Sequence, residues 1–359
     1  MTRRIGNGCA LNVRGFEAHA AVFQKARDAA VRGSSGMIRG TVAIAVEDLR
    51  KVYHVREGGS WRGRTREITA LDGISFSVAA GEIAGFIGPN GAGKSTAIKI
   101  LSGILRPTSG IVRVGDLVPW QDRRAHVARI GVVFGQRTQL WWDLSVAEGL
   151  GLLRDIYGVD PERFARNRAR LTEALDLGGI MDQSVRQLSL GQRMRAEIAA
   201  ALLHDPEVLI LDEPTIGLDA PSKLAVRAFV RDLRRERGTT VLLTTHDMHD
   251  IEALAERVIV IGHGRILTDS PFQDLRATTL SERILEADFV TEPPVLDLPH
   301  GATETMRDGR SVTITFDPRL VPAQVLVAQL SAVPGLDDLR IGRPAIEEII
   351  TRFYADHAT

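Results

Sequence analysis

The feature that most constrains this chain is a glycine-rich loop between an apolar strand and an apolar helix. Residues 82–100 read EIAGFIGPNGAGKSTAIKI, so a strand ending at Ile87 leads into the loop and then into a helix. This segment fits G-x-x-x-x-G-K-[ST] in the strand–loop–helix context that the motif requires. Glycines let backbone N–H groups point at phosphate oxygens, and the helix N-terminus adds positive potential. The sequence therefore predicts a phosphate-binding loop within an α/β fold.

The side chains of this loop predict individual roles. We expect Lys94 to reach the β- and γ-phosphates of a nucleotide and the Ser95 hydroxyl to ligate Mg²⁺. The other positions expected to contact the nucleotide are Gly88, Pro89, Asn90, Gly91, Ala92, Gly93 and Thr96.

A second element of phosphate chemistry is the segment 207–214, EVLILDEP. Its apolar residues predict a buried strand that ends in two carboxylates. Asp212 is positioned to hold magnesium through water, and Glu213 to orient or deprotonate a water molecule. The alternative is a strand capped by two solvated acids, which the neighbouring phosphate loop makes the weaker interpretation.

Composition excludes several classes of protein. The chain has 359 residues and a formal net charge of zero, which argues against nucleic acid as a partner. Its single cysteine, Cys9, excludes a disulfide framework and favours a reducing compartment. We find no apolar run long enough to cross a bilayer.

Five ordered motifs give the chain a family resemblance. They are the phosphate loop, LSLGQRMRAEIAAALLHDP at 188–206, LILDEP, GLD at 217–219 and TTHDM at 244–248. Over residues 39–270 this order resembles the nucleotide-binding subunit of an ATP-binding-cassette (ABC) transporter. The resemblance implies a P-loop NTPase fold, with a RecA-like core, an antiparallel β subdomain and a helical signature subdomain. FGQRTQLWWDL, LSLGQRMR and DEPTIGLD are similar to ATPases of ABC-2-type exporters, including sodium, drug and viologen exporters.

The resemblance also implies roles at the nucleotide. Gln136 matches the Q-loop glutamine, which would ligate magnesium or the attacking water. His246 matches the switch histidine that would hydrogen-bond the γ-phosphate and keep Glu213 and water aligned. Tyr53 matches the aromatic that stacks on adenine, and such stacking is worth ~1–3 kcal/mol per base. Taken alone, a histidine after an apolar strand, as His246 is, is more often a structural residue. The alternative for Tyr53 is a strand aromatic that faces the core.

In this family the site is completed by a second ATPase copy, either identical or a paralogue. Ser189, Gly191 and Gln192 match the signature segment that would contact ATP bound to the partner. Leu190 departs from the glycine common in the superfamily, and we expect this to be tolerated because its side chain would lie at a helix start. Asp219 matches a residue that lies across the dimer interface.

Two adjacent tryptophans, Trp141 and Trp142, follow Gln136 closely. In the family, a groove beside the helical subdomain, here roughly residues 137–190, receives a short helix from an integral membrane permease. We interpret both tryptophans as partly exposed lining of that groove, since aromatics are common interface anchors. The alternative is that at least one of them packs within the subdomain.

We divide the chain into three parts. Residues 1–38 are expected to be a disordered extension, 39–270 the nucleotide-binding domain, and 271–359 a small C-terminal α+β accessory domain. In the last part, ERILEADFV and SVTITF alternate as strands do, with a turn at Asp308-Gly309. VPAQVLVAQLSAV and PAIEEIITRFYADH predict helices with proline near their starts.

These inferences combine into one functional interpretation. The chain is expected to be the ATP-binding and ATP-hydrolysing subunit of an ABC-2-type exporter, using ATP and Mg²⁺ at the cytoplasmic face of the cell membrane. The alternatives are the ATPase of an ABC importer, which would share every catalytic motif, or an ABC ATPase that acts on nucleic acid or ribosomes. The latter usually carry coiled-coil arms, zinc modules or two cassettes, and we see none of these.

Overall fold

The computed structural model describes residues 42–56, 65–135, 137–278 and 283–342. Within these ranges the chain forms three β-sheets, of six, three and four strands. The expected extension at 1–38, Gln136 and the last predicted helix all lie outside the described residues.

The six-stranded sheet carries the phosphate-binding loop. Its order is β5 (Ile130–Phe134), β6 (Val208–Asp212), β7 (Thr240–Thr244), β3 (Ile83–Ile87), β8 (Arg257–Gly262) and β9 (Arg265–Pro271). The first five strands are parallel, and β9 pairs antiparallel with β8. Every residue of β3 and β7 is buried, because helices cover both faces of a parallel sheet. The carboxyl ends of β3 and β6 therefore lie at the same edge.

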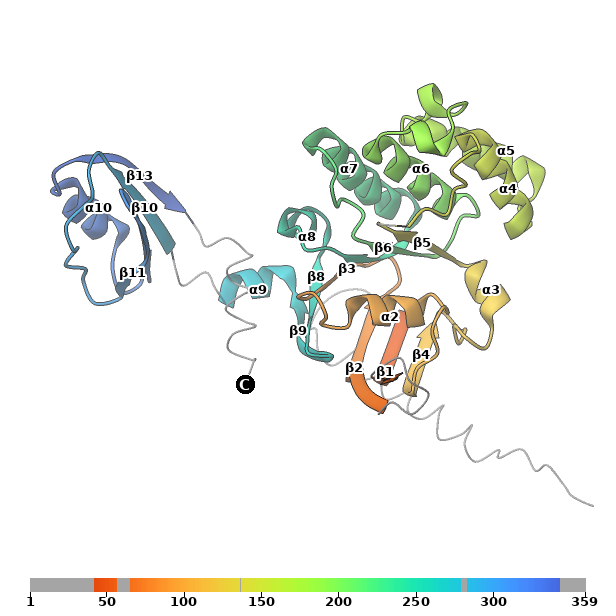
Figure 1. Ribbon diagram of the computed structural model, residues 1–359, viewed down its shortest axis with the longest axis horizontal. Coiled ribbons are helices and arrows are strands. Elements are labelled where there is room, and N and C mark those ends of the chain that lie inside the picture. The colour runs from red at the N-terminus through yellow and green to blue at the C-terminus, as the bar shows by residue number, and fades with distance from the viewer. Residues whose placement is uncertain (1–41, 57–64, 136, 279–282, 343–359) are drawn as a thin grey trace, which may run out of the picture. The chain divides into compact units, whose positions relative to one another are not determined.

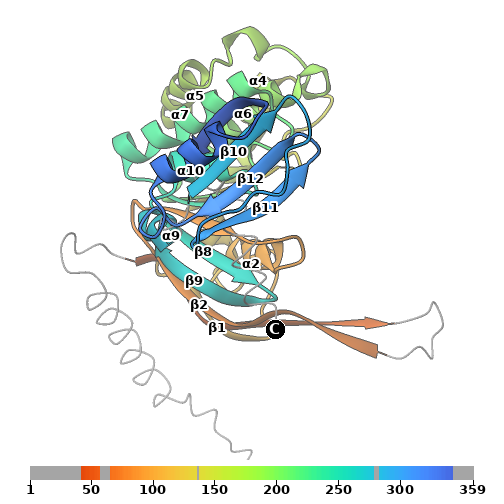
Figure 2. The same ribbon diagram turned by 90° about the vertical axis from the view of Figure 1, so that its left-hand side faces the viewer.

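The three-stranded antiparallel sheet has the order β2 (Thr65–Ala79), β1 (Val42–Arg56), β4 (Ser109–Val114). Figure 2 shows β1 and β2 side by side as a long ribbon. Helix α2 (Lys94–Leu101) joins this sheet to the six-stranded one, because Ile98 and Leu101 share a buried cluster with Leu49 and Phe86. Figure 1 shows α2 on one side of β3, β5 and β6, with α6 (Leu190–Leu202) and α7 (Ala220–Arg237) on the other.

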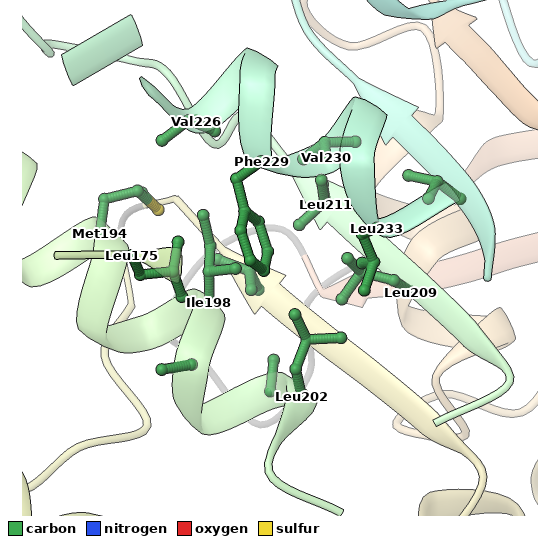
Figure 3. Packing of buried hydrophobic residues seen from close by; sticks show 14 of the residues in the cluster. Leu175, Met194, Ile198, Leu202, Leu209, Leu211, Val226, Phe229, Val230 and Leu233 are labelled. Atoms are coloured by element: carbon green, nitrogen blue, oxygen red, sulfur yellow. The ribbon is translucent and has the colours of Figure 1, made fainter. Parts of the chain in front are cut away.

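Small apolar residues of α6 and larger ones of α7 pack together against the sheet. Helix α6 buries four alanines, Ala196, Ala199, Ala200 and Ala201, which let neighbouring backbones approach closely. Phe229 of α7 fills the space between α6 and the sheet, in one cluster with Ile198 and Leu211 (Figure 3). This packing fixes the N-termini of both helices relative to β6.

The predicted helical subdomain contains α4 (Val146–Tyr157) and α5 (Pro161–Ala174). Helix α4 begins at a capping box formed by Ser145 and Glu148, in which each residue satisfies a backbone N–H of the other. Helix α5 begins with Pro161 after the N-cap Asp160, and proline suits the first helical position because it has no N–H to satisfy. Three short helices lie outside this subdomain: α3 (Arg123–Val127), α8 (Met248–Leu254) and α9 (Phe272–Thr278).

The C-terminal residues form an antiparallel sheet with its own core. The order is β11 (Ala302–Asp308), β12 (Ser311–Phe316), β10 (Arg283–Phe289), β13 (Leu336–Gly342). Helix α10 (Ala323–Ser331) lies on one face (Figure 1) and packs Leu326 and Leu330 into that core. The predicted strands, the turn at Asp308-Gly309 and the first predicted helix are all present, whereas β11 and β13 were not predicted.

Candidate nucleotide site

The loop between β3 and α2 is built by left-handed glycines and closed by its own lysine. Gly91 and Gly93 have φ of 82° and 112°, a region that residues with a Cβ rarely adopt. A Cβ on Gly93 would also lie 2.6 Å from the carbonyl oxygen of Ala70. Lys94 Nζ donates to the carbonyl oxygens of Gly88 at 2.5 Å and Pro89 at 3.1 Å. The lysine is therefore held across the loop whose N–H groups would surround a phosphate.

Two carboxylates at the end of β6, Asp212 and the following Glu213, act on Lys94. The lysine is 8% exposed, and its burial lowers the pKa of the ammonium group, while the charges of Glu213 and Asp212 oppose that change. Both acids stand at the carboxyl end of β6, the same edge of the parallel sheet at which the loop follows β3. The structure thus brings together the two sequence elements that predicted phosphate chemistry.

Each carboxylate is positioned by β7. Thr244 Oγ1 donates to Asp212 Oδ1 at 2.6 Å. Glu213 has a positive φ of 57°, an uncommon conformation for a residue with a side chain. Its N–H donates to the carbonyl oxygen of Thr244 at 2.9 Å. The chain turns sharply at Glu213. The same residue of the neighbouring strand, Thr244, therefore holds both consecutive acids, Asp212 through its hydroxyl and Glu213 through its carbonyl oxygen.

His246 lies two residues beyond the end of β7 and contacts Glu213. Its Nδ1 is 2.6 Å from Glu213 Oε2. An ionised carboxylate can only accept hydrogen bonds, so Nδ1 is the donor. The His246 side chain is largely exposed and that of Glu213 mostly buried. The imidazole therefore has open space around it, whereas the acid is half-buried.

The segment on either side of Gln136 lies against the same acids. Gln136 is outside the described residues, but the N–H of Gly135 donates to the carbonyl oxygen of Asp212 at 2.7 Å. A Cβ on Gly135 would lie 2.4 Å from the carbonyl oxygen of Glu213, so this position requires glycine. The chain therefore enters the Q-loop in contact with the carboxylate pair.

The predicted signature residues gather at the N-termini of α6 and α7. Ser189 caps α6, since its Oγ accepts from the N–H of Gln192 at 3.2 Å and the Gln192 side chain accepts from the N–H of Ser189 at 2.9 Å. Asp219 caps α7 by accepting from the N–H of Ser222 at 3.0 Å. A Cβ on Gly191 would lie 2.3 Å from Ser222 Oγ. A side chain at this position would therefore have to displace Ser222, so the two helix starts approach closely here.

Leu190 is the first residue of α6 and is half-buried, as expected for a side chain at a helix start. Tyr53 lies on β1 opposite Ile68 and is also half-buried, with Lys51 Nζ 5.2 Å from its ring centroid. The Tyr53 side chain is thus neither buried in the core nor fully exposed to solvent.

Both tryptophans are exposed. Trp141 has 40% and Trp142 51% of its surface accessible. The guanidinium carbon of Arg193, on α6, lies 5.5 Å from the Trp142 ring centroid, within cation–π range. Neither ring is buried within the helical subdomain, which is what the interpretation as groove lining requires.

Sequence reasoning missed a buried polar cluster behind His246. Asp250 on α8 is fully buried and accepts hydrogen bonds from Thr245 Oγ1 at 3.1 Å, from Arg227 Nε at 2.6 Å and from the Thr215 hydroxyl. Its three partners come from three different segments, so no local motif could have revealed it.

Comparison with known proteins shows which family has this arrangement. The sequence profile described as ABC transporter matches residues 71–216. The daunorubicin resistance ATP-binding protein DrrA3 of Streptomyces coeruleorubidus is 34% identical over 299 residues, covering 80% of this chain and 92% of the relative. The chain belongs to the ABC transporter family. It is an ATP hydrolase, the ATPase subunit of a transporter, and the P-loop NTPase fold expected from the sequence is confirmed.

Other ABC relatives differ in the direction of transport that their names give. The Nod factor export ATP-binding protein I of Ralstonia nicotianae is 32% identical over 320 residues, covering 88% of this chain and 94% of the relative. The methionine import ATP-binding protein MetN of Streptomyces griseus is 35% identical over 308 residues, covering 82% and 79%. The relatives therefore share the family and differ in the direction of transport.

Solved ABC cassettes share the fold. The dimeric, post-hydrolysis structure of the ATP-binding cassette MJ0796 with ADP and Pi matches with a TM-score of 0.55 and 26% identity. The match covers 64% of this chain and 98% of that one. Among the described residues of this ABC ATPase, no helix is both long and apolar enough to cross a membrane.

Proposed function

We propose that this ABC ATPase energises export through a separate membrane permease, by hydrolysing ATP between two cassettes. The observation that carries the hydrolytic part is the convergence of Lys94, Asp212, Glu213 and His246 at one edge of the sheet. Export is supported by the exporter-like stretches of the sequence and by two relatives whose names give drug resistance and export. The chain would then act at the cytoplasmic face of the membrane as a peripheral subunit.

In this proposal the loop residues 88–96 hold the triphosphate of ATP. Backbone N–H groups and the N-terminus of α2 face the phosphates, and Lys94 exchanges its bonds to Gly88 and Pro89 for phosphate oxygens. Tyr53 stacks on the adenine. Neutralising the phosphate charge is the main contribution a protein can make to phosphoryl transfer.

The residues near the loop also fit Mg²⁺. Ser95 presents an exposed hydroxyl, and Asp212 presents a carboxylate oriented by Thr244; magnesium prefers such hard oxygen ligands. We assign the ion to Ser95, Asp212 and Gln136. When bound, it supplies further neutralisation of the phosphate oxygens.

Glu213 is the proposed base that orients the attacking water, and His246 is the switch. In the structure, His246 donates to Glu213. With ATP present, the exposed imidazole turns to the γ-phosphate and leaves the Glu213 carboxylate free to accept from water. The positive φ and backbone hydrogen bond of Glu213 keep that carboxylate in place during the exchange.

We propose that Ser189, Gly191 and Gln192 contact ATP held by a second copy, with Asp219 at the interface between copies. The start of α6 suits this role, because helix N-termini attract anions. Hydrolysis then removes the γ-phosphate contacts and lets the pair separate. Trp141 and Trp142 are the proposed docking face for the permease, which connects the nucleotide state to the membrane subunit.

Substituting Glu213 tests the hydrolytic assignment. In Glu213→Gln we expect ATP to bind normally and a dimer to accumulate in sizing experiments with ATP. ATP turnover should fall by about 10²-fold or more, the usual contribution of a general base. The exposed Glu207→Gln, on the same segment, is the matched control. Turnover at the parental rate in Glu213→Gln would show that the base is another residue.

Import is the second candidate, favoured by the methionine importer relative. Cells that express the chain with its permease can be scored for accumulation of daunorubicin and of labelled methionine. Export of a drug such as daunorubicin predicts lower daunorubicin accumulation that returns to baseline in Glu213→Gln. ATP-dependent methionine uptake without any effect on daunorubicin would favour import.

A further inference from the structure

Glu197 is a buried acid that the proposed mechanism does not use. It lies on α6, eight residues after Ser189, and is 4% exposed among buried alanines. A carboxylate in such surroundings is costly unless its oxygens accept hydrogen bonds. Its partners therefore indicate what the position does.

Among the described residues, the carboxylate accepts its hydrogen bonds from one stretch of three residues, directly before the tryptophans. Oε2 accepts from the N–H of Gln139 at 3.0 Å, and Oε1 accepts from the N–H of Leu140 at 3.4 Å and from the Thr138 hydroxyl. The Gln139 side chain also donates to the backbone carbonyl of Glu197 at 3.2 Å. Helix α6 thus holds residues 138–140 by four hydrogen bonds, at a sequence separation of 57 to 59 residues.

A second contact ties α6 to the same segment. Arg193, one helical turn before Glu197, lies over the ring of Trp142. Burial raises the pKa of Glu197, and the hydrogen bonds and the charge of Arg193 act in the opposite direction. The acid and the arginine together fasten residues 138–142 to the helix that begins at Ser189.

We propose that Glu197 is a positioning residue that makes α6 and the Trp141–Trp142 segment move as one body. If the proposed function holds, Ser189 at the start of α6 contacts ATP on the partner copy. Movement of α6 on dimer closure is then carried through Glu197 to the face that the permease contacts. The same connection would transmit docking at the tryptophans back to Ser189.

Glu197→Gln breaks this connection with little change of shape. An amide has a single acceptor oxygen, and its NH₂ group cannot accept from the N–H groups of Gln139 or Leu140. The donor side of this connection can be changed separately. Thr138→Val removes one hydroxyl donor and leaves the Glu197 carboxylate with its two backbone donors. Glu173→Gln, an exposed glutamate on α5, is the matched control.

The test follows the fluorescence of Trp141 and Trp142 in full-length Glu213→Gln protein carrying Trp61→Phe and Trp120→Phe. Adding ATP should form a dimer and shift the tryptophan emission. With Glu197→Gln added, the dimer should still form but the emission change should fall by at least half. Thr138→Val should give a smaller loss, and Glu173→Gln none. Thr138→Val also serves as the decisive variant if Glu197→Gln does not fold.

The outcomes separate this inference from the proposed function. Failure of ATP to dimerise the Glu213→Gln protein would contradict the two-cassette mechanism itself. A dimer that forms with an undiminished emission change in both Glu197→Gln and Thr138→Val would overturn the role of Glu197. If Glu197 only stabilises the fold, both variants should keep the full emission change and have a lower melting temperature than the parent.

Discussion

Arg227 donates from Nε to Oδ1 of Asp250 at 2.6 Å, and this ion pair joins two helices that follow functional motifs. Arg227 lies on α7, which begins after Asp219, and Asp250 lies on α8, which begins after His246. Their side chains are 14% and 1% exposed. The helices that follow the proposed interface residue and the proposed switch are therefore joined by a buried contact.

Breaking this pair should destabilise the fold. Arg227→Met leaves the Asp250 carboxylate buried with only hydroxyl donors, and removing one partner of a buried pair costs about 3–5 kcal/mol. Urea denaturation would measure the free energy of unfolding. Arg231→Met is the control, because Arg231 is exposed and, within the described part of the chain, its hydrogen bond goes to a backbone carbonyl, at 3.3 Å. A loss no larger in Arg227→Met than in Arg231→Met would contradict the structural importance of the pair.

Acid should weaken the neighbouring contact between Lys223 and Asp247, which are 2.5 Å apart. Burial raises the pKa of Asp247, but the hydrogen bond and charge of Lys223 and the charge of Arg227 outweigh it, leaving the pKa below 3.8. The folded state therefore binds fewer protons than the unfolded chain. The ion pair stabilises the fold at pH values above the unfolded-chain pKa of 3.8. This stabilisation is lost as the pH falls through the lower pKa that Asp247 has in the folded state.

The corresponding prediction compares melting temperatures from pH 6 down to pH 3. Lys223→Met should lower the melting temperature at pH 6 and reduce the further loss on acidification. Lys223→Arg keeps the charge and should preserve the parental acid sensitivity. An unchanged acid profile in Lys223→Met would mean that Asp247 does not depend on Lys223.

Gly93→Ala should disrupt nucleotide binding. The substitution forces a Cβ onto a φ of 112° and to 2.6 Å from the carbonyl oxygen of Ala70, so the loop must move. We expect ATP affinity to fall at least ~10-fold, equivalent to about 1.4 kcal/mol. Gly178→Ala is the control, since a Cβ there meets nothing within 4 Å. Titration with a fluorescent ATP analogue would measure both, and equal affinities would show that the loop tolerates a side chain.

Lys94→Ala should weaken ATP binding rather than only its hydrolysis. Without the ammonium group, Asp212 and Glu213 would face the phosphates with their charge less compensated. We expect a loss of affinity of about 10²-fold, or roughly 2.7 kcal/mol, measured by calorimetry. Lys99→Ala, in the last turn of the same helix, should bind ATP as the parent does. Normal affinity in Lys94→Ala would exclude direct phosphate contact.

Replacing both tryptophans should uncouple transport from hydrolysis. Trp141→Ala with Trp142→Ala removes two exposed aromatics without emptying the core, so the ATPase rate of the isolated subunit should stay within about twofold. Hot-spot aromatics often contribute 2 kcal/mol or more to an interface, so co-purification with the permease and transport should both be lost. Ile156→Ala, at another exposed apolar residue of the helical subdomain, should leave both intact. Normal transport in the double variant would contradict docking at this face.

Several parts of the molecule could be predicted because their information is local. The phosphate loop has its glycines, its lysine and both flanking elements within one short segment. The acids Asp212 and Glu213 follow an apolar strand directly. In the C-terminal sheet, β10 and β12 lie inside the sheet and alternate clearly, whereas the unpredicted strands β11 and β13 lie at its two edges. Edge strands are more solvated and more polar, so they lack the hydrophobic alternation that reveals a strand.

The sequence by itself determined the fold class, the phosphate loop and the order of the catalytic motifs, because residues close along the chain determine the local backbone conformation. Only the tertiary structure decided the partners of Asp250 and Glu197. Their hydrogen bonds join residues up to 35 and 59 positions apart. A buried carboxylate and a solvated one look the same in a sequence. What separates them is the packing that removes water and the donors that other segments then supply.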